Sequence, residues 1–255
     1  MDVHPRKTAD ETAQAPARRP RDVAMAPPAH RTGMRMASVA YQQIKEQLLE
    51  GHWKAGERLS LEIFKTALGV SKQPIMEALR RLDADGLVEI IPQVGCRVAS
   101  YDSHDVADYF TLFGAFEGAI AGVAAARRTD ADLTVLHGVH RQIGDLCGHT
   151  DQTIRAHGYR VLNRDFHGVI HRMARSTLVE EMSLRMWDLS DFLINTAGLP
   201  QPLSSALEHR HADHQAIYDA LVAGDAAAAR TSMEAHILGT VGIISHELAA
   251  ADISD

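Results

Sequence analysis

The sequence predicts a mainly helical protein with two domains: an N-terminal unit of three helices and a β-hairpin, and a C-terminal antiparallel bundle of helices. Two observations support this fold class. Apolar residues recur at helical spacing along most of the chain, and two short strand-like runs, "LVEII" and "CRVAS", stand close together between residues 87 and 100. A length of 255 residues with 45% hydrophobic residues is sufficient for two folded cores.

Charge divides the chain into unequal parts. Residues 1–35 carry seven Lys/Arg against four Asp/Glu and are rich in Pro and Ala without apolar periodicity, which predicts a disordered tail. Residues 36–101 carry eight of each sign, whereas residues 102–255 carry 11 Lys/Arg against 21 Asp/Glu. A polyanionic partner is therefore expected to meet the N-terminal part of the chain, because the C-terminal part would repel it.

Nothing in the sequence indicates a membrane or an oxidising compartment. No run approaches the roughly 18 uninterrupted apolar residues that a membrane span requires, and the first residues contain no apolar signal-peptide core. Cys96 and Cys147 stand far apart without a neighbouring cysteine, which predicts two structural thiols rather than a disulfide framework. We expect a cytoplasmic protein with no membrane partner.

The N-terminal domain, residues 36–101, begins with two predicted helices. The first starts at Ser38 and ends at Gly51, and the segment "KAGERLS" then turns the chain. The second carries apolar residues from Leu61 onward and ends at Gly69, where a positive φ is expected. A sharp turn into a further helix follows.

The stretch "GVSKQPIMEALRRLDADGLV" predicts this third helix and both of its ends. Ser71 is a suitable N-cap, Pro74 falls in the first turn where its missing N–H costs little, and Gly86 closes the helix. After it, "LVEII" and "CRVAS" form a hairpin around "PQVG". The apolar stripe of the helix consists of Ile75, Ala78, Leu79 and Leu82.

This order of helix, helix, sharp turn, helix and β-hairpin is that of a winged helix-turn-helix. The apolar stripe holds the third helix against the first two, so its N-terminal end is free to enter a major groove of DNA. Of the two adjacent arginines in this helix, one could instead bridge to the domain below. The whole unit could also be a small helical domain without a nucleic acid partner. The candidate DNA-binding residues are Ser71, Lys72, Gln73, Arg80, Arg81, Gly95 and Arg97.

Residues 40–100 resemble the winged-helix domain of GntR-type bacterial transcription regulators. The matching motifs are "GxxKxGERL", "LGVS", "EALRRL", "DGLV" and "GCRV". The family usually has Pro at the position of Ala55, Arg at that of Lys72, and Arg at that of Met76. The resemblance implies that a double-stranded DNA operator is the partner of this domain.

Residues 102–255 are predicted to form the helical bundle. Ser103 can cap its first helix, and no stretch shows the alternation of a strand. Successive amphipathic helices of this kind pack as an antiparallel bundle. After the first helix, the others are expected at about residues 133–146, 154–173, 178–194, 207–221 and 226–248.

Histidine is concentrated in this bundle, since twelve of the 15 lie at or beyond His104. Asn163 and His167 stand one helical turn apart beside the apolar stripe, and His214 and His236 lie among apolar residues of two other predicted helices. The three imidazoles could converge, and a divalent cation would satisfy them together with an oxygen ligand. Alternatively, each is a hydrogen-bonded core histidine. Three further histidines, His171, His209 and His211, are expected at surface or boundary positions, although His171 and His211 lie one turn from the predicted ligands and could be alternative or supporting ligands.

The bundle resembles the FCD ligand-binding domain of the FadR-like branch of GntR regulators, through "LNRDFH", "DHQAIYDALVAGDAAAA" and "MEAHI" in that order. The resemblance implies that Asn163, His167, His214 and His236 hold a divalent transition metal such as zinc, nickel or manganese. Its open positions would take a small carboxylate effector. Asp is frequent in the family at the position of Asn163. The resemblance further implies a homodimer that binds a palindromic operator, commonly as a repressor that the effector releases.

A metal-dependent enzyme using the same three histidines is the alternative from a different class. Against it, the sequence contains no HExxH, GxSxG, Walker-type or GxGxxG motif, and no carboxylate stands out as a general base. Asp165 is near His167 in sequence but projects from another face of the helix. A third class is an interaction module whose helix-turn-helix has lost DNA binding, and only Met76 points to it.

Overall fold

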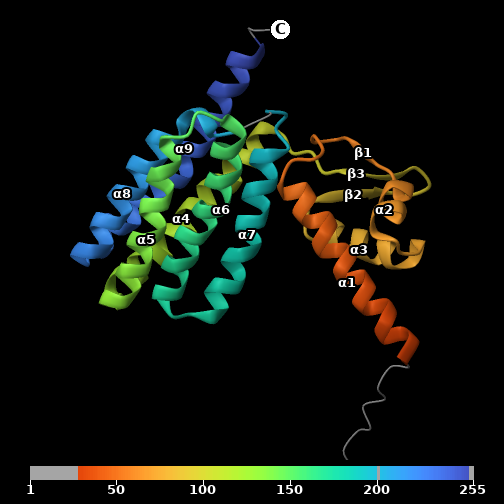
Figure 1. The fold of residues 1–255 in the computed structure, drawn as a ribbon, viewed down its shortest axis with the longest axis horizontal. Coiled ribbons are helices and arrows are strands. Elements are labelled where there is room, and N and C mark those ends of the chain that lie inside the picture. The colour runs from red at the N-terminus through yellow and green to blue at the C-terminus, as the bar shows by residue number, and fades with distance from the viewer. Residues whose placement is uncertain (1–27, 200–201, 253–255) are drawn as a thin grey trace, which may run out of the picture.

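The computed structural model describes residues 28–199 and 202–252 and consists of two helical units side by side, which meet where α7 packs against α1 (Figure 1). The predicted fold class, a winged helix-turn-helix followed by a helical bundle, is confirmed. The N-terminal unit contains α1 (Pro28–Leu49), β1 (Arg58–Leu59), α2 (Leu61–Leu68), α3 (Lys72–Ala84), β2 (Val88–Ile91) and β3 (Gly95–Val98).

Helix α1 starts earlier than the sequence indicates. It begins at Pro28, so residues 28–35 are helical where the sequence predicts a disordered tail. This segment contains good helix formers such as Ala, Arg and Met. A helix that is held by its packed part can extend through such residues without an apolar periodicity of their own. The rest of the predicted tail, residues 1–27, lies outside the described residues.

The turn between α2 and α3 has the predicted geometry. Gly69 ends α2 with a φ of 63°, a left-handed conformation that costs glycine little, and its N–H donates to the Lys65 carbonyl. Ser71 occupies the N-cap position of α3, but its hydroxyl makes no capping hydrogen bond. The predicted stripe is buried in the core of the unit, and its members are Ile75, Ala78, Leu79 and Leu82.

The wing is a three-stranded antiparallel sheet in the order β1-β3-β2, rather than a two-stranded hairpin. Strands β2 and β3 form the predicted hairpin, with Ile91 opposite Gly95. The additional strand, β1, places Arg58 opposite Arg97 of β3. Two residues are too few to show the alternation of a strand, so the sequence predicts only a turn at "KAGERLS".

Within the described residues, the C-terminal unit contains the predicted helices, and a short 3-10 helix precedes α8. Helix α4 is central and packs against α6, α7, α8 and α9. Its N-cap is Asp102 rather than Ser103, because the Asp102 carboxylate accepts hydrogen bonds from the N–H groups of His104 and Asp105. The elements are α4 (Ser103–Arg127), α5 (Asp130–Cys147), α6 (Gln152–Ala174), α7 (Thr177–Asn195), η1 (Ser204–Ala206), α8 (Leu207–Ala223) and α9 (Ala226–Asp252).

The apolar character of α4 follows from its central position. By length and composition alone α4 could cross a membrane, but 56% of its most apolar segment is buried inside the protein. It also lies close to α9, since a Cβ added at Gly118 would be 2.5 Å from the Glu234 Cγ and 3.0 Å from the Arg230 carbonyl oxygen. A core helix of a bundle explains both properties.

Candidate nucleic-acid interface and metal centre

The N-terminal end of α3 is exposed, as a DNA-reading element requires. Ser71, Lys72 and Gln73 are all exposed, and Lys72 and Gln73 have no side-chain hydrogen bond or ion pair within the described part of the chain. Met76, one turn later, is half-buried and packs against the core of the unit. Three polar side chains at one helix end are therefore available to a partner.

Two of the predicted arginines form exposed ion pairs. Arg80 Nη1 lies 3.3 Å from Glu77 Oε2 on α3, and Arg97 Nη2 lies 2.7 Å from Glu89 Oε2 across the wing. Exposed pairs of this kind contribute little to stability, typically about 0–1 kcal/mol. A phosphate group could therefore replace either carboxylate.

Arg81 faces α1 instead of the outer surface of α3. Its guanidinium carbon lies 4.0 Å from the ring centroid of Tyr41, and its Nη1 lies 3.4 Å from Ser38 Oγ. A guanidinium over a tyrosine ring is a stabilising cation–π contact. Of the two adjacent arginines, Arg81 is thus the one that bridges to another element.

The wing contains an arginine that was absent from the predicted site. Arg58 is exposed, and its Nη2 donates to the Val94 carbonyl at the wing tip over 2.9 Å. Arg58 is the arginine of the "GERL" motif, and this motif could have identified it from the sequence. Gly95 begins β3 with a φ of 136°, and a Cβ added there would meet no atom within 4 Å. The wing therefore combines a cation with an accessible backbone.

Three histidines from three helices meet inside the bundle. His167 of α6, His214 of α8 and His236 of α9 are no more than 1% exposed. One ring nitrogen from each lies within 4.8 Å of the others, and His214 Nε2 lies 3.2 Å from His236 Nε2. The imidazoles thus converge as the sequence predicts.

Several polar atoms in and beside this triad lack a hydrogen-bond partner. They are both ring nitrogens of His167, Nδ1 of His214, and Oδ1 of Asn163, which lies one turn before His167 on α6. Leaving one such buried atom unpaired costs about 1–3 kcal/mol. A divalent cation would bind one nitrogen of each ring, so it could satisfy one His167 nitrogen and the Asn163 oxygen, and imidazole nitrogens with an amide oxygen are suitable ligands for a transition metal. The residues present therefore fit a metal centre.

Burial keeps the three imidazoles neutral. Desolvation lowers the pKa of His167, His214 and His236 well below the ordinary histidine value, and neighbouring positive groups lower each pKa further. The neutral imidazole is the form that binds metals. The triad is thus in the protonation state that ligation requires at neutral pH.

A buried arginine beside the triad was also absent from the predicted site. Arg210 is 2% exposed, and its Nη2 lies 3.0 Å from His236 Nε2. Asp213 Oδ2 lies 3.2 Å from Arg210 Nη1 and 3.4 Å from His236 Nδ1. Arg210 precedes His214 by one helical turn, and this spacing is the signal that could have identified it.

The additional histidines have other surroundings. His171 is buried, and its Nε2 lies 2.8 Å from Glu117 Oε2. His209 is exposed, and His211 is half-buried with its ring stacked on that of His140 at a centroid distance of 4.3 Å. Surface and boundary positions thus describe His209 and His211, whereas His171 belongs to a buried polar pair.

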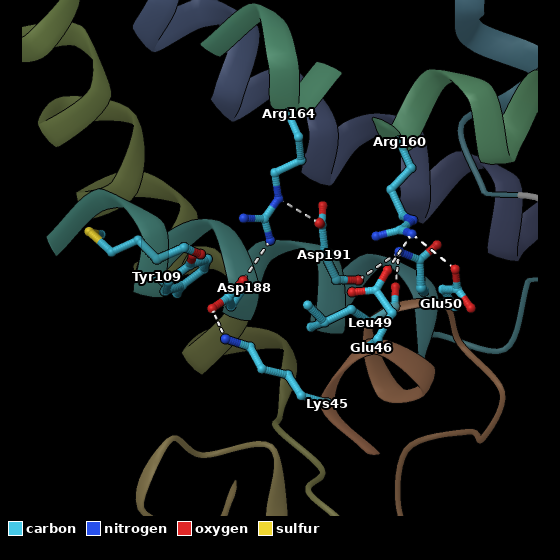
Figure 2. Close-up of polar contacts among 11 residues, drawn as sticks. Lys45, Glu46, Leu49, Glu50, Tyr109, Arg160, Arg164, Asp188 and Asp191 are labelled. Atoms are coloured by element: carbon cyan, nitrogen blue, oxygen red, sulfur yellow. Dashed lines mark hydrogen bonds and ion pairs between the residues drawn. The ribbon is translucent and has the colours of Figure 1, made fainter. Parts of the chain in front are cut away.

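Helices α6 and α7 connect the triad to the winged helix-turn-helix. Figure 2 shows Arg160 and Arg164 extending from α6 toward acidic side chains of α1 and α7. Arg164 Nη2 lies 2.9 Å from Asp188 Oδ1, and its Nε lies 2.8 Å from Asp191 Oδ2. Asp188 also accepts a hydrogen bond from Lys45 of α1. One carboxylate therefore joins the two units.

A second set of contacts lies beside the first. Arg160 Nη2 is 2.8 Å from Oε1 of Glu46 on α1 and 3.1 Å from Oε1 of Glu50, the residue directly after α1 (Figure 2). Asn195, the last residue of α7, donates from Nδ2 to the Leu49 carbonyl over 2.9 Å. The C-terminal end of α1 is thereby bound by both α6 and α7.

The two units also share apolar packing and a backbone hydrogen bond. Phe192 of α7 is fully buried within the hydrophobic core of the N-terminal unit. The N–H of Ala55 donates to the Thr196 carbonyl over 3.1 Å. The proline that the GntR-type domain usually has at this position would lack that donor. Helix α7 and the residue after it are therefore attached to the winged helix-turn-helix by packing and by a backbone hydrogen bond.

Comparisons with known proteins agree with this architecture. Residues 36–98 match the bacterial regulatory proteins of the gntR family, and residues 108–239 match the FCD domain. The chain is 27% identical over 213 residues to the HTH-type transcriptional repressor GlaR of Escherichia coli, covering 82% of this chain and 96% of that protein. It is 26% identical over 221 residues to the probable D-xylose utilization operon transcriptional repressor of Paenarthrobacter nicotinovorans, covering 85% and 92%.

Solved structures share the fold. McbR/YncC of Escherichia coli has a TM-score of 0.69 at 19% identity, covering 84% of this chain and 98% of that chain. A GntR regulator from a Rhodococcus species has a TM-score of 0.66 at 20% identity, covering 83% and 98%. The gntR family consists of transcription regulators, so the metal-dependent enzyme is set aside. With both domains matched, the protein belongs to the GntR family of DNA-binding transcription regulators, in the FadR-like branch with a C-terminal FCD domain.

Proposed function

We propose that this regulator is a homodimeric repressor of a palindromic operator, and that a small organic acid held at a divalent metal in the bundle controls its DNA binding. The observation that carries the proposal is the buried triad of His167, His214 and His236, together with the unpaired lone pairs around it. Two relatives that span most of the chain are named as repressors, which supports the direction of control. The proposed location is the cytoplasm, where operator DNA lies.

The DNA contacts are proposed from exposure and charge. The N-terminal end of α3 attracts phosphate through its helix dipole and presents hydrogen-bonding side chains to base edges. A palindromic operator has two half-sites, and two copies of α3 are needed to read them, which favours a homodimer. Arg81 is left out because it is engaged with Tyr41. The proposed contacts are Ser71, Lys72, Gln73, Arg80, Gly95 and Arg97, with Arg58 added.

In the proposed metal centre, His167, His214 and His236 supply imidazole nitrogens and Asn163 supplies an amide oxygen. When bound, a divalent transition metal supplies a Lewis acid to which a carboxylate oxygen can attach. Zinc, nickel and manganese all accept such ligands. The surrounding bundle is acidic, with 21 Asp/Glu against 11 Lys/Arg in residues 102–255, so a local cation is needed to attract an anionic effector.

The proposed route of control runs along α6. This helix carries His167 and, one and two turns earlier, Arg164 and Arg160, which bind α7 and α1. An effector can shift the regulator between two arrangements only through a difference in affinity for them. Displacement of α6 at the metal would change that balance, because the same helix holds the groups that fasten α1.

Replacing Asp188 by Asn is expected to loosen the winged helix-turn-helix from the bundle without unfolding either. Asn preserves the size of the side chain but removes the charge that Lys45 and Arg164 share. A hydrogen bond to a charged group contributes about 1.5–3 kcal/mol, so amides of α1 should exchange with deuterium roughly tenfold faster. Hydrogen-exchange mass spectrometry measures this directly.

The matched control for this experiment is Asp132→Asn. Asp132 pairs with Arg175 Nη2 at 2.8 Å within the bundle, away from α1. The control should leave deuterium exchange in α1 unchanged. Equal exchange of α1 in the wild type and the Asp188→Asn variant would rule out this junction as the route of control.

The proposed function is tested by binding of the purified protein to the intergenic DNA beside its own gene. Operator affinity should fall steeply with salt, because neutralising phosphates releases counterions, and the footprint should cover two half-sites about one helical turn apart. Light scattering should give the mass of a dimer on the operator. Binding that is insensitive to salt, or a monomer on a single half-site, would contradict the proposal.

A further inference from the structure

Arg210 of α8 is a buried cation whose position the proposed function leaves unexplained. Its Nη1 donates to the His236 carbonyl over 2.8 Å and to Asp213 Oδ2 over 3.2 Å. Its Nη2 lies 3.0 Å from His236 Nε2 and 3.2 Å from Thr240 Oγ1, and its Nε lies 3.3 Å from the Tyr159 hydroxyl. The guanidinium is therefore anchored on several sides at the edge of the triad.

The contact with Nη2 determines the tautomer of His236. A guanidinium has N–H donors and no acceptor, so His236 Nε2 must offer its lone pair and Nδ1 must carry the ring proton. The Asp213 carboxylate, with Oδ2 at 3.4 Å from Nδ1, is placed to accept that proton in a hydrogen bond. His236 thus has the tautomer of a metal ligand, but Arg210 already uses the lone pair.

A metal held by the triad requires that same lone pair. One lone pair cannot serve both a metal and an N–H donor, so metal binding must displace the contact between Arg210 Nη2 and His236 Nε2. The two bonds of Nη1, to the His236 carbonyl and to Asp213, would still hold the guanidinium beside the metal while Nη2 moves away from the ring. Two positive groups would then stand side by side, and an anion between them would be strongly favoured.

We propose that Arg210 receives the carboxylate of the effector, and that it does so only when the metal is bound. This inference rests on the proposed metal site. A guanidinium suits the role because the N–H of Nη2 that metal binding frees can donate a charge-assisted hydrogen bond to a carboxylate oxygen. The charge of Arg164 also lowers the pKa of His167, but both Asp188 and Asp191 already form ion pairs with its guanidinium.

Titration calorimetry on the full chain tests the proposal with Zn²⁺ alone and with acetate and benzoate as carboxylate probes. Acetamide and benzamide serve as uncharged counterparts of nearly the same shape. The wild-type protein should bind Zn²⁺, and at least one of the two carboxylates should then bind to the zinc-loaded form. Neither carboxylate should bind after treatment with a chelator, and neither amide should bind in either form.

The Arg210→Gln variant separates the two parts of the inference. It should bind Zn²⁺ at least as tightly as the wild type, because the competitor for the His236 lone pair is gone. It should bind the carboxylate at least about tenfold more weakly, because a charge-assisted hydrogen bond is lost. The matched control is Arg155→Gln, since Arg155 is a buried guanidinium that pairs with Glu208 at 2.9 Å. The control should bind both as the wild type does.

Several results would overturn the inference. Carboxylate binding that is equally strong without zinc, or unchanged in Arg210→Gln, excludes the conditional role, as does a zinc-loaded wild type that binds neither carboxylate. If Arg210→Gln loses zinc binding as completely as His236→Ala does, Arg210 only positions His236 and does not receive the carboxylate. A wild type that binds no zinc or other transition metal would refute the metal centre itself, and the inference with it. If Arg210→Gln does not fold, Arg210→Lys takes its place, since it keeps the charge but not the guanidinium, and carboxylate binding as tight as in the wild type would then overturn the inference.

Discussion

Replacing His167 and His214 together by alanine is expected to abolish metal binding by the purified protein. The wild type should hold about one equivalent of a transition metal per chain after reconstitution, as expected of a chain with one metal site. The variant loses two of the three imidazoles, and the lone pair of His236 Nε2 is already engaged by Arg210. Elemental analysis after dialysis against metal-free buffer measures the result.

The matched control for this experiment is His140→Ala with His211→Ala. His140 lies on α5 and His211 on α8, and their rings stack at a centroid distance of 4.3 Å. Neither belongs to the triad. The control removes the same number of imidazoles and should retain the metal. Metal kept by the triad variant, or lost equally from the control, would falsify the assignment. If metal is lost from the triad variant and kept by the control, the search for an effector should concentrate on carboxylates.

The fold could be predicted where local chemistry and burial agree. Gly69 adopts the positive φ that its position after an apolar run indicates, and the stripe that begins at Ile75 is buried throughout. The prediction failed where structure does not depend on a repeating pattern. Strand β1 has two residues, and the first turns of α1 need no apolar face. Asp102 replaces Ser103 as a cap because both are good caps, and only the backbone decides between them.

The candidate site divides in the same way. His167, His214 and His236 could be named from the sequence because each lies among apolar residues of a predicted helix. The spacing of Arg210 one turn before His214 could have placed it near the triad, but its contact with His236 joins two different helices and could not be predicted.

The arginines of α3 show a related limit. Arg80 and Arg81 differ by about 100° around the helix, which is enough to send one to Glu77 and the other to Tyr41. Sequence alone could not decide which of the two turns toward α1, because that depends on where α1 crosses α3. The packing of α1 against α3 therefore decides that Arg80, and not Arg81, is available to DNA.

Replacing Lys72 and Gln73 together by alanine is expected to remove operator recognition while the protein remains folded. Both side chains are exposed at the start of α3 and have no partner among the described residues, so the free energy of unfolding should change by less than about 0.5 kcal/mol. Each base-edge contact contributes about 1–3 kcal/mol of discrimination, so the pair should cost at least about 30-fold in operator affinity. Fluorescence anisotropy with operator and scrambled duplexes gives the ratio.

Lys65→Ala is the control that separates charge from recognition. Lys65 belongs to α2 and pairs with Glu62 at 2.9 Å, so its removal deletes a positive charge from the same domain without touching α3. Loss of a phosphate contact would weaken operator and scrambled DNA alike and reduce the salt slope by about one, whereas loss of a base contact reduces only the ratio between them. The Lys72/Gln73 variant should therefore bring the two affinities together. If it keeps the wild-type ratio and footprint, α3 does not read the operator through its N-terminal end, and the wing must supply the specificity.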